Sequence, residues 1–129
     1  MSAQVVLDAS AVLALLFGEA GADVVAQACI GGALLSSASY AEASGVLVAR
    51  GLARNLAEET LDVLGVEVVA FDKAQALETG WLKRIASDAR LSLGDRCTLA
   101  LARTLGLPVL TADPAWAGLA IGVEVRLTG

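Results

Sequence analysis

Five short apolar runs mark the chain, each bounded by glycine, proline or polar residues and each of the length of a β-strand. The predicted strands are residues 5–7, 33–35, 66–71, 108–111 and 123–127. These runs are nearly all apolar, which is typical of strands buried on both faces of a sheet. The pattern therefore predicts a mainly parallel sheet that is covered on both sides.

Segments with helix-forming composition alternate with these runs. The predicted helices are residues 9–17, 22–30, 39–52, 55–64, 73–89 and 92–105. Ser37 or Ser39 is expected to cap the start of the third helix, and Gly106 the end of the last. Residues 114–122 are expected to form a loop or a short turn. No repeat, low-complexity tract or linker interrupts this alternation, so residues 1–129 are predicted to form a single α/β domain.

The composition fits a folded protein with a large core. Of the 129 residues 57% are hydrophobic, and the mean hydropathy of +0.70 excludes an intrinsically disordered chain. The longest apolar stretches, residues 11–17 and 105–110, fall well short of the ~18 residues that a membrane-spanning helix needs. The first residues lack the basic start of a signal peptide. We therefore expect a soluble cytoplasmic protein whose cysteines, Cys29 and Cys97, are reduced and buried.

The absence of histidine restricts the chemistry further. It excludes serine and cysteine catalysis with a histidine base, and it excludes zinc sites built on imidazole. Any reaction must use carboxylates, hydroxyls, lysine, arginine or a metal ion held by oxygen atoms. A net charge of −5 argues mildly against nonspecific binding to nucleic acid.

Four acidic residues fall where they could meet at the carboxyl edge of the sheet, where ligands bind in such folds. Asp8 ends the first predicted strand and Asp113 follows the fourth, while Glu42 and Asp95 lie near the starts of two helices. Carboxylates this close either have raised pKa values or hold a cation. Oxygen ligands select hard cations such as Mg²⁺ or Mn²⁺, which suit phosphodiester chemistry. With these acids assigned to a metal site, the remaining charge is nearly balanced and compatible with RNA binding.

Each acid also has a purely structural interpretation. Asp8 and Asp95 could cap the helices that follow them, Glu42 could pair with Arg50 or another arginine, and Asp113 could be a turn residue. The hydroxyls near them, Ser10 and Thr111, could equally satisfy backbone groups.

Four short motifs occur in order along the chain: Val6-Leu7-Asp8-Ala9-Ser10-Ala11, Ser39-Tyr40-Ala41-Glu42-Ala43, Leu93-Gly94-Asp95-Arg96-Cys97 and Leu110-Thr111-Ala112-Asp113. In these motifs the chain resembles the PIN-domain ribonucleases, specifically the VapC-type toxins of bacterial toxin–antitoxin pairs. The resemblance covers essentially the whole chain. It implies a three-layer α/β/α sandwich around a mainly parallel sheet of about five strands. It also implies Mg²⁺- or Mn²⁺-dependent endoribonuclease activity, homodimerisation and neutralisation by a cognate antitoxin.

The resemblance also assigns roles to residues. Asp8, Glu42, Asp95 and Asp113 correspond to the catalytic acids that bind the metal, and Ser10 and Thr111 to the hydroxyls that support them. A metal-activated water would then attack the RNA phosphodiester and leave a 5′-phosphate and a 3′-hydroxyl.

Two other functions remain open at this stage. One is a catalytically silent PIN-like module that only binds partners. The other is a different Mg²⁺-dependent phosphoryl-transfer enzyme, but an aspartyl-phosphate mechanism usually needs a second aspartate two positions after Asp8, where Ser10 stands. Stabilisation by Mg²⁺ or Mn²⁺ would separate a metal site from a silent module.

Overall fold

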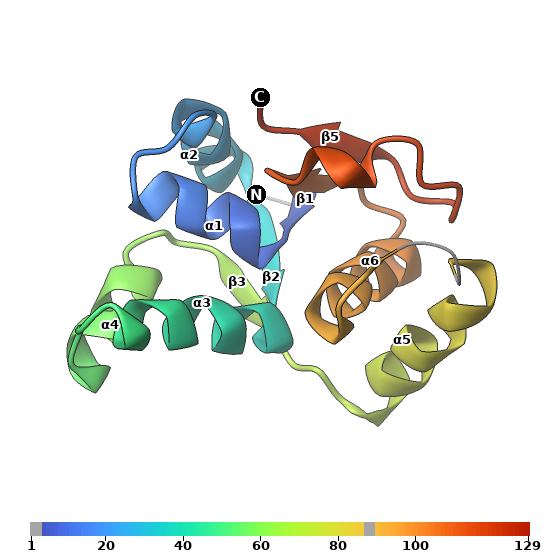
Figure 1. The fold of residues 1–129 in the computed structure, drawn as a ribbon, viewed down its shortest axis with the longest axis horizontal. Helices are drawn as coiled ribbons and strands as arrows, with labels where there is room; N and C mark the ends of the chain where they lie inside the picture. Colours follow the sequence, from blue (N-terminus) through green and yellow to red (C-terminus); the bar gives the residue numbers. More distant parts are fainter. Residues whose placement is uncertain (1–3, 87–89) are drawn as a thin grey trace.

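Figure 1 shows the computed structural model, which describes residues 4–86 and 90–129. The strands are β1 (Val5–Leu7), β2 (Ala33–Ser36), β3 (Glu67–Val69), β4 (Val109–Thr111) and β5 (Val125–Leu127). The helices are α1 (Ala9–Leu16), α2 (Ala22–Gly31), α3 (Ser37–Ala49), α4 (Arg54–Asp62), α5 (Lys73–Ile85) and α6 (Leu93–Leu105). A 3₁₀ helix, η1 (Pro114–Trp116), lies in the segment expected to be a loop or turn.

All strand pairs are parallel, and the strand order is β3-β2-β1-β4-β5. From the central strand β1 the chain first builds β2 and β3 on one side and then returns to add β4 and β5 on the other. Leu7 of β1 is therefore in register with Leu35 on one side and Leu110 on the other. This reversal creates a crevice beyond the carboxyl ends of β1 and β4, the usual place for a ligand in open α/β sheets.

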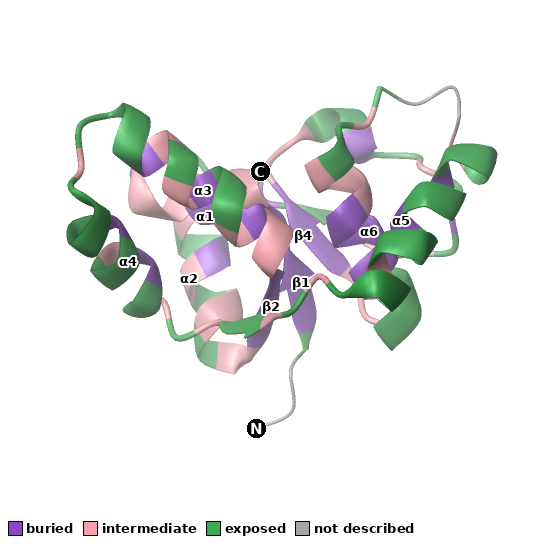
Figure 2. Ribbon diagram, turned by 90° about the horizontal axis from the view of Figure 1, so that it is seen from below, coloured by how far each residue is buried: buried purple, intermediate pink, exposed green. Residues whose placement is uncertain are grey.

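Helices cover both faces of the sheet, because successive side chains of a strand point to opposite faces. Val5 and Leu7 pack into one core cluster with residues of α1 to α4. Val6 packs into a second cluster with residues of α5 and α6. Figure 2 shows these buried positions running along the central strands between the two helix groups. The predicted α/β/α sandwich is confirmed.

The structure corrects several predicted boundaries. The predicted caps of the third helix are wrong: Ser36 is the N-cap, because its hydroxyl accepts a hydrogen bond from the Ala38 amide at 3.2 Å. The third strand is shorter than predicted, because at the edge of the sheet it pairs only with β2, over residues 67–69. The helix predicted over 73–89 ends at Ile85, and residues 87–89 of that prediction lie outside the described residues.

Two further expectations concern the thiols and the membrane. Both cysteines are free. Cys97 is buried as predicted, but the predicted burial of Cys29 is wrong, because this residue of α2 is only half-buried. Among residues 4–86 and 90–129, no helix has the length and apolar character that crossing a bilayer requires.

Candidate active site

A cleft of about 220 Å³ opens at the carboxyl ends of β1 and β4. All four acids predicted from the sequence line it, although they come from four separate segments of the chain. The lining residues are Asp8, Ala9, Ser10, Leu13, Glu42, Val46, Gly94, Asp95, Thr98 and Asp113. We call this hollow the acid cleft. None of its lining residues is basic, so no lysine or arginine within the lining neutralises the carboxylates.

Asp8 is the most firmly held of these acids and is 4% exposed. Its Oδ1 accepts hydrogen bonds from the Ala11 amide and the Ser10 hydroxyl, both at 2.8 Å. Its Oδ2 accepts from Ser10 at 2.8 Å and from the Thr111 hydroxyl at 2.6 Å. The bond from Ala11 makes Asp8 the N-cap of α1, so the capping interpretation describes part of what this residue does.

Burial raises the pKa of Asp8, and the negative charge of Asp95 adds to this increase. The hydrogen bonds from Thr111, Ala11 and Ser10 act in the opposite direction, because they stabilise the charged form. Asp8 is thus an electrostatically costly carboxylate kept in one orientation by its neighbours. Such groups are enriched at functional sites.

Ser10 and Thr111 connect Asp8 to the segment that carries Asp113. The Ser10 hydroxyl accepts a hydrogen bond from the Ala112 amide at 3.1 Å, and Thr111 Oγ1 accepts from the Asp113 amide at 3.1 Å. The two hydroxyls lie 3.2 Å apart. The network therefore links the carboxyl ends of β1 and β4. It places the backbone amide of Asp113 beside the Ser10 and Thr111 hydroxyls that bind Asp8.

Glu42 projects from the first turns of α3, and its carboxylate packs against Gly94 at the start of α6. A Cβ at position 94 would overlap that carboxylate. Partial burial raises the pKa of Glu42, and the charges of Asp95 and Asp8 raise it further. Arg50 is not its partner: the Arg50 guanidinium lies over the Phe17 ring, 4.0 Å from its centroid.

Sequence reasoning did not predict the contact of Glu42 with Gly94, although Gly94 belongs to one of the four motifs. A glycine in the first turn of a helix, beside a predicted ligand, was the available signal for a close approach. Thr98 was also missed. It lines the acid cleft one turn after Asp95, and its hydroxyl shares a buried hydrogen bond of 2.9 Å with Ser39 of α3.

Asp95 and Asp113 also act as caps. Asp95 forms a capping box with Ser92: the Ser92 amide donates to Asp95 Oδ2 at 3.0 Å, and the Asp95 amide donates to the Ser92 hydroxyl at 3.1 Å. Asp113 Oδ1 accepts from the Ala115 amide at 2.9 Å and begins η1. Each bond engages one carboxylate oxygen, so the other oxygen accepts no hydrogen bond within the described part of the chain.

The acids line one cleft without forming a compact cluster. Within residues 4–86 and 90–129, no three acidic or cysteine side chains are close enough to make a ready metal-ligand group. The donor set nevertheless fits a hard divalent cation, because it offers carboxylate oxygens alone. Over the same described residues, the ion pairs found are Arg103–Glu78 and Arg126–Glu124. In the part of the chain that the structure describes, the acids of the cleft therefore have no ion-pair partner to offset their charge.

Comparison with protein families identifies the domain that carries this cleft. Residues 5–121 match the PIN domain. The chain belongs to the PIN-domain family. Among its relatives, this PIN domain is 32% identical over 114 residues to the VapC ribonuclease Mb2780c of Mycobacterium bovis, covering 81% of this chain and 87% of that protein. Ribonuclease VapC42 of Mycobacterium tuberculosis matches with the same identity and coverage. The resemblance to VapC-type PIN domains is therefore confirmed.

Solved structures share the fold of this PIN domain at lower sequence identity. A toxin–antitoxin complex from Klebsiella pneumoniae aligns with a TM-score of 0.73 at 18% identity, over 98% of each chain. DNA-bound VapBC from Salmonella typhimurium gives a TM-score of 0.72 at 16% identity, over 99% of this chain and 100% of that one. The Sarcin-Ricin loop cleaving toxin VapC20 of Mycobacterium tuberculosis gives 0.68 at 16% identity, over 93% and 98%.

Proposed function

We propose that this protein is a metal-dependent endoribonuclease toxin of the VapC type, which hydrolyses RNA phosphodiester bonds and is neutralised by a cognate antitoxin. The observation that carries the proposal is the acid cleft itself: four carboxylates from separate segments line one hollow with no basic residue among its lining. Membership of the PIN-domain family and similarity to proteins named VapC ribonucleases support the same activity.

Asp8, Glu42, Asp95 and Asp113 are the proposed ligands of Mg²⁺ or Mn²⁺. When bound there, such a cation would activate water and offset the charge that develops on the phosphate. Support for this assignment comes from the oxygen-only donor set and from the raised pKa values of Asp8 and Glu42, whose negative charge a cation would stabilise.

The other residues orient these acids. Ser10 and Thr111 donate hydrogen bonds to Asp8 and hold its carboxylate in one plane. Gly94 leaves room for the Glu42 carboxylate at the start of α6. Water attack on the phosphodiester would leave a 5′-phosphate and a 3′-hydroxyl.

The proposed setting is the cytoplasm, where RNA is the substrate and an antitoxin the protein partner. Similarly folded chains from Klebsiella pneumoniae and Salmonella typhimurium are part of a toxin–antitoxin complex and of VapBC, respectively.

We also propose a homodimer. An exposed apolar stripe on α5 supports association: Leu77, Trp81 and Ile85, spaced by four residues, are 75%, 44% and 38% exposed.

The direct test is incubation of the purified protein with total cellular RNA in Mg²⁺, Mn²⁺ or EDTA. We expect discrete fragments with metal, none in EDTA and none from Asp8→Asn. Asp23→Asn is the matched control, because it removes the same charge from an exposed position on α2. Cleavage that persists in EDTA, or in Asp8→Asn, would contradict the assigned site.

Thermal melting with the same metals separates the alternatives. A functional site predicts stabilisation of the wild type, by about 2.7 kcal/mol when the cation is at a hundred times its Kd. Stabilisation should be lost in Asp8→Asn and kept in Asp23→Asn. Neither cleavage nor metal-dependent stabilisation would favour the silent PIN-like module.

A further inference from the structure

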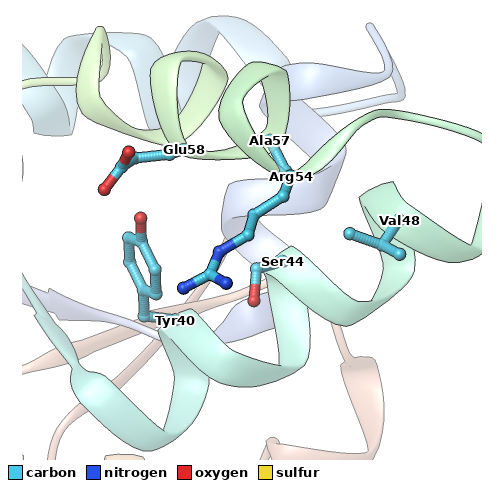
Figure 3. Close-up of a pocket in the computed structure, with 6 residues that line it drawn as sticks. All are labelled: Tyr40, Ser44, Val48, Arg54, Ala57 and Glu58. Atoms are coloured by element: carbon cyan, nitrogen blue, oxygen red, sulfur yellow. The ribbon is translucent and has the colours of Figure 1, made fainter.

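A second pocket, of about 240 Å³, lies between α3 and α4. Its lining residues are Tyr40, Ser44, Val48, Arg54, Ala57 and Glu58, and none of them lines the acid cleft. Figure 3 shows Tyr40, Ser44 and Val48 along one side of α3, facing α4. Glu42 and Val46, which alternate with them, line the acid cleft on another side of the same helix. Helix α3 is therefore a wall common to both hollows.

Helix stability does not explain the charged residues of this pocket. Arg54 is the first residue of α4, where the helix dipole disfavours a cation. Glu58 follows four residues later, and this arginine-before-glutamate order is the weaker one for a helical ion pair. Among the described residues no ion pair joins them. In Figure 3 the Arg54 side chain instead reaches across the pocket toward α3.

Tyr40 supplies a fixed aromatic surface with a hydroxyl at its end. Its ring packs against the first core cluster, and in Figure 3 its hydroxyl points toward the Glu58 carboxylate. A phenol hydroxyl can both donate and accept a hydrogen bond.

These groups select a flat ligand with hydrogen-bond donors on one edge and acceptors on another. Glu58 accepts only and Arg54 donates only, while Tyr40 and the 51%-exposed Val48 offer apolar surface. A phosphate or carboxylate ligand would be attracted by Arg54 and repelled by Glu58, so the pair favours a neutral ligand that contacts both residues. Guanine fits both edges: its N1–H and N2 amino group can donate to one carboxylate, and its O6 and N7 accept from arginine. Adenine lacks the adjacent pair of donors.

We propose that the pocket between α3 and α4 binds a guanine base of the RNA and thereby selects where the chain is cut. This inference rests on the proposed ribonuclease function. Single-stranded RNA is commonly recognised in this way, by stacking on aromatic side chains and hydrogen bonding to the base edges. Because a helix with its side chains is about 10–12 Å wide, a short single strand crossing α3 can place a base in this pocket and a phosphodiester in the acid cleft.

Cleavage of a defined RNA tests the base contact. From mapped cleavage sites we would take an oligonucleotide whose cut lies at a fixed distance from a guanosine, and replace that guanosine by inosine, which lacks the N2 amino group. We expect the wild type to cut the inosine RNA about tenfold more slowly or worse. Glu58→Gln should cut both RNAs at the same reduced rate. Glu59→Gln removes the same charge at the next, exposed position outside the pocket, and it should keep the wild-type preference.

Binding of free nucleosides in EDTA tests the pocket without cleavage. Guanosine should shift the NMR signals of Tyr40 and Ser44 in the wild type, and it should do so at lower concentration than inosine or adenosine. No shift, or equal shifts from all three nucleosides, overturns the guanine pocket. So does cleavage by Glu58→Gln that retains the full preference for guanosine over inosine. A wild type that cuts no RNA in any metal contradicts the nuclease proposal, and the nucleoside binding still decides the pocket.

Discussion

At the scale of single residues, Asp8 combines two opposing effects. Burial makes its charged form costly, while hydrogen bonds from Ser10, Thr111 and Ala11 hold that form in place. A carboxylate whose only task was to cap α1 could do so at the surface without this cost. The metal-free protein therefore carries a destabilising charge that the proposed cation would offset.

This charge predicts how the stability of the metal-free protein depends on pH. Folding raises the pKa values of Asp8 and Glu42. In the pH window between the ordinary carboxyl pKa of about 4 and these raised values, the native state therefore binds more protons than the unfolded state. Their contribution to the free energy of unfolding is therefore largest below that window and falls as pH rises through it. Urea unfolding in EDTA between about pH 4 and pH 7 measures this slope.

Asp8→Asn should flatten the slope, whatever constant offset the lost hydrogen bonds introduce. Asp23→Asn, at an exposed position, should leave the slope as in the wild type. Superimposable slopes for wild type and Asp8→Asn would show that Asp8 titrates normally.

Gly94 allows stability and function to be separated at one position. Alanine is preferred to glycine within helices by up to ~1 kcal/mol, so Gly94→Ala should leave the free energy of unfolding unchanged or slightly raised. Its Cβ would displace the end of the flexible Glu42 side chain. We expect metal-dependent cleavage to fall about 10–100-fold, the usual effect of disturbing the support of a metal ligand.

Gly45→Ala is the matched control for this change, because a Cβ at that helical glycine would meet nothing within 4 Å. It should keep full activity. Equal cleavage by Gly94→Ala and Gly45→Ala would mean that the position of Glu42 against Gly94 has no role in the reaction.

At the scale of elements, helix caps position the acids of the cleft. Ser92 caps α6 and is bonded to Asp95 in both directions, whereas Asp72 caps α5 by accepting from the Gln75 amide at 2.9 Å. Ser92→Ala and Asp72→Ala should each lower the free energy of unfolding by about 1 kcal/mol. Only Ser92→Ala should also slow cleavage, because it frees the start of the helix that carries Asp95. Urea unfolding and RNA cleavage of both variants measure the two effects. An equal loss of activity in both would assign the effect to stability alone.

The elements also show where sequence reasoning succeeds and fails. Continuous apolar runs and glycine boundaries locate the strands and helices, because burial on both faces leaves a strong pattern. The start of α3 was missed because Ser36, Ser37 and Ser39 are chemically equal as caps, and the end of β2 decides among them. Asp72 caps α5, a role that sequence reasoning did not predict.

Contacts between residues far apart in the sequence were also not predicted. The Thr111 bond to Asp8 spans 103 positions, and the pocket between α3 and α4 exists only once these helices pack together. The order of the motifs predicted which acids would meet at the carboxyl edge of the sheet. The capping box of Ser92 and Asp95 follows a known spacing, but the contact of Glu42 with Gly94 depends on side-chain geometry that no spacing rule specifies.

At the scale of the whole molecule, the sheet joins two separate core clusters. Leu7 belongs to the cluster beneath α1 to α4 and Val6 to the one beneath α5 and α6, so neighbouring residues of β1 serve both. Loss of one helix layer would expose one face of the strands. The opposite face of the same strands packs against the second layer. We therefore propose that residues 1–129 unfold as one cooperative domain.

Leu47→Ala tests this cooperativity because the substituted residue and the fluorescent reporter lie in different clusters. Leu47 of α3 is 2% exposed in the first cluster, and Trp116 is 1% exposed in the second. The substitution should lower the free energy of unfolding by about 2–5 kcal/mol. In a Trp81→Phe background, tryptophan fluorescence reports Trp116 alone. We expect its midpoint in urea to fall together with the midpoint measured by far-UV circular dichroism. Val63→Ala, at an 81%-exposed position, should shift neither signal appreciably.

If the fluorescence midpoint stays at its wild-type value while the dichroism midpoint falls, the two layers unfold separately. The acid cleft, which draws Asp8 and Glu42 from one layer and Asp95 from the other, would then lose its shape before the second core melts.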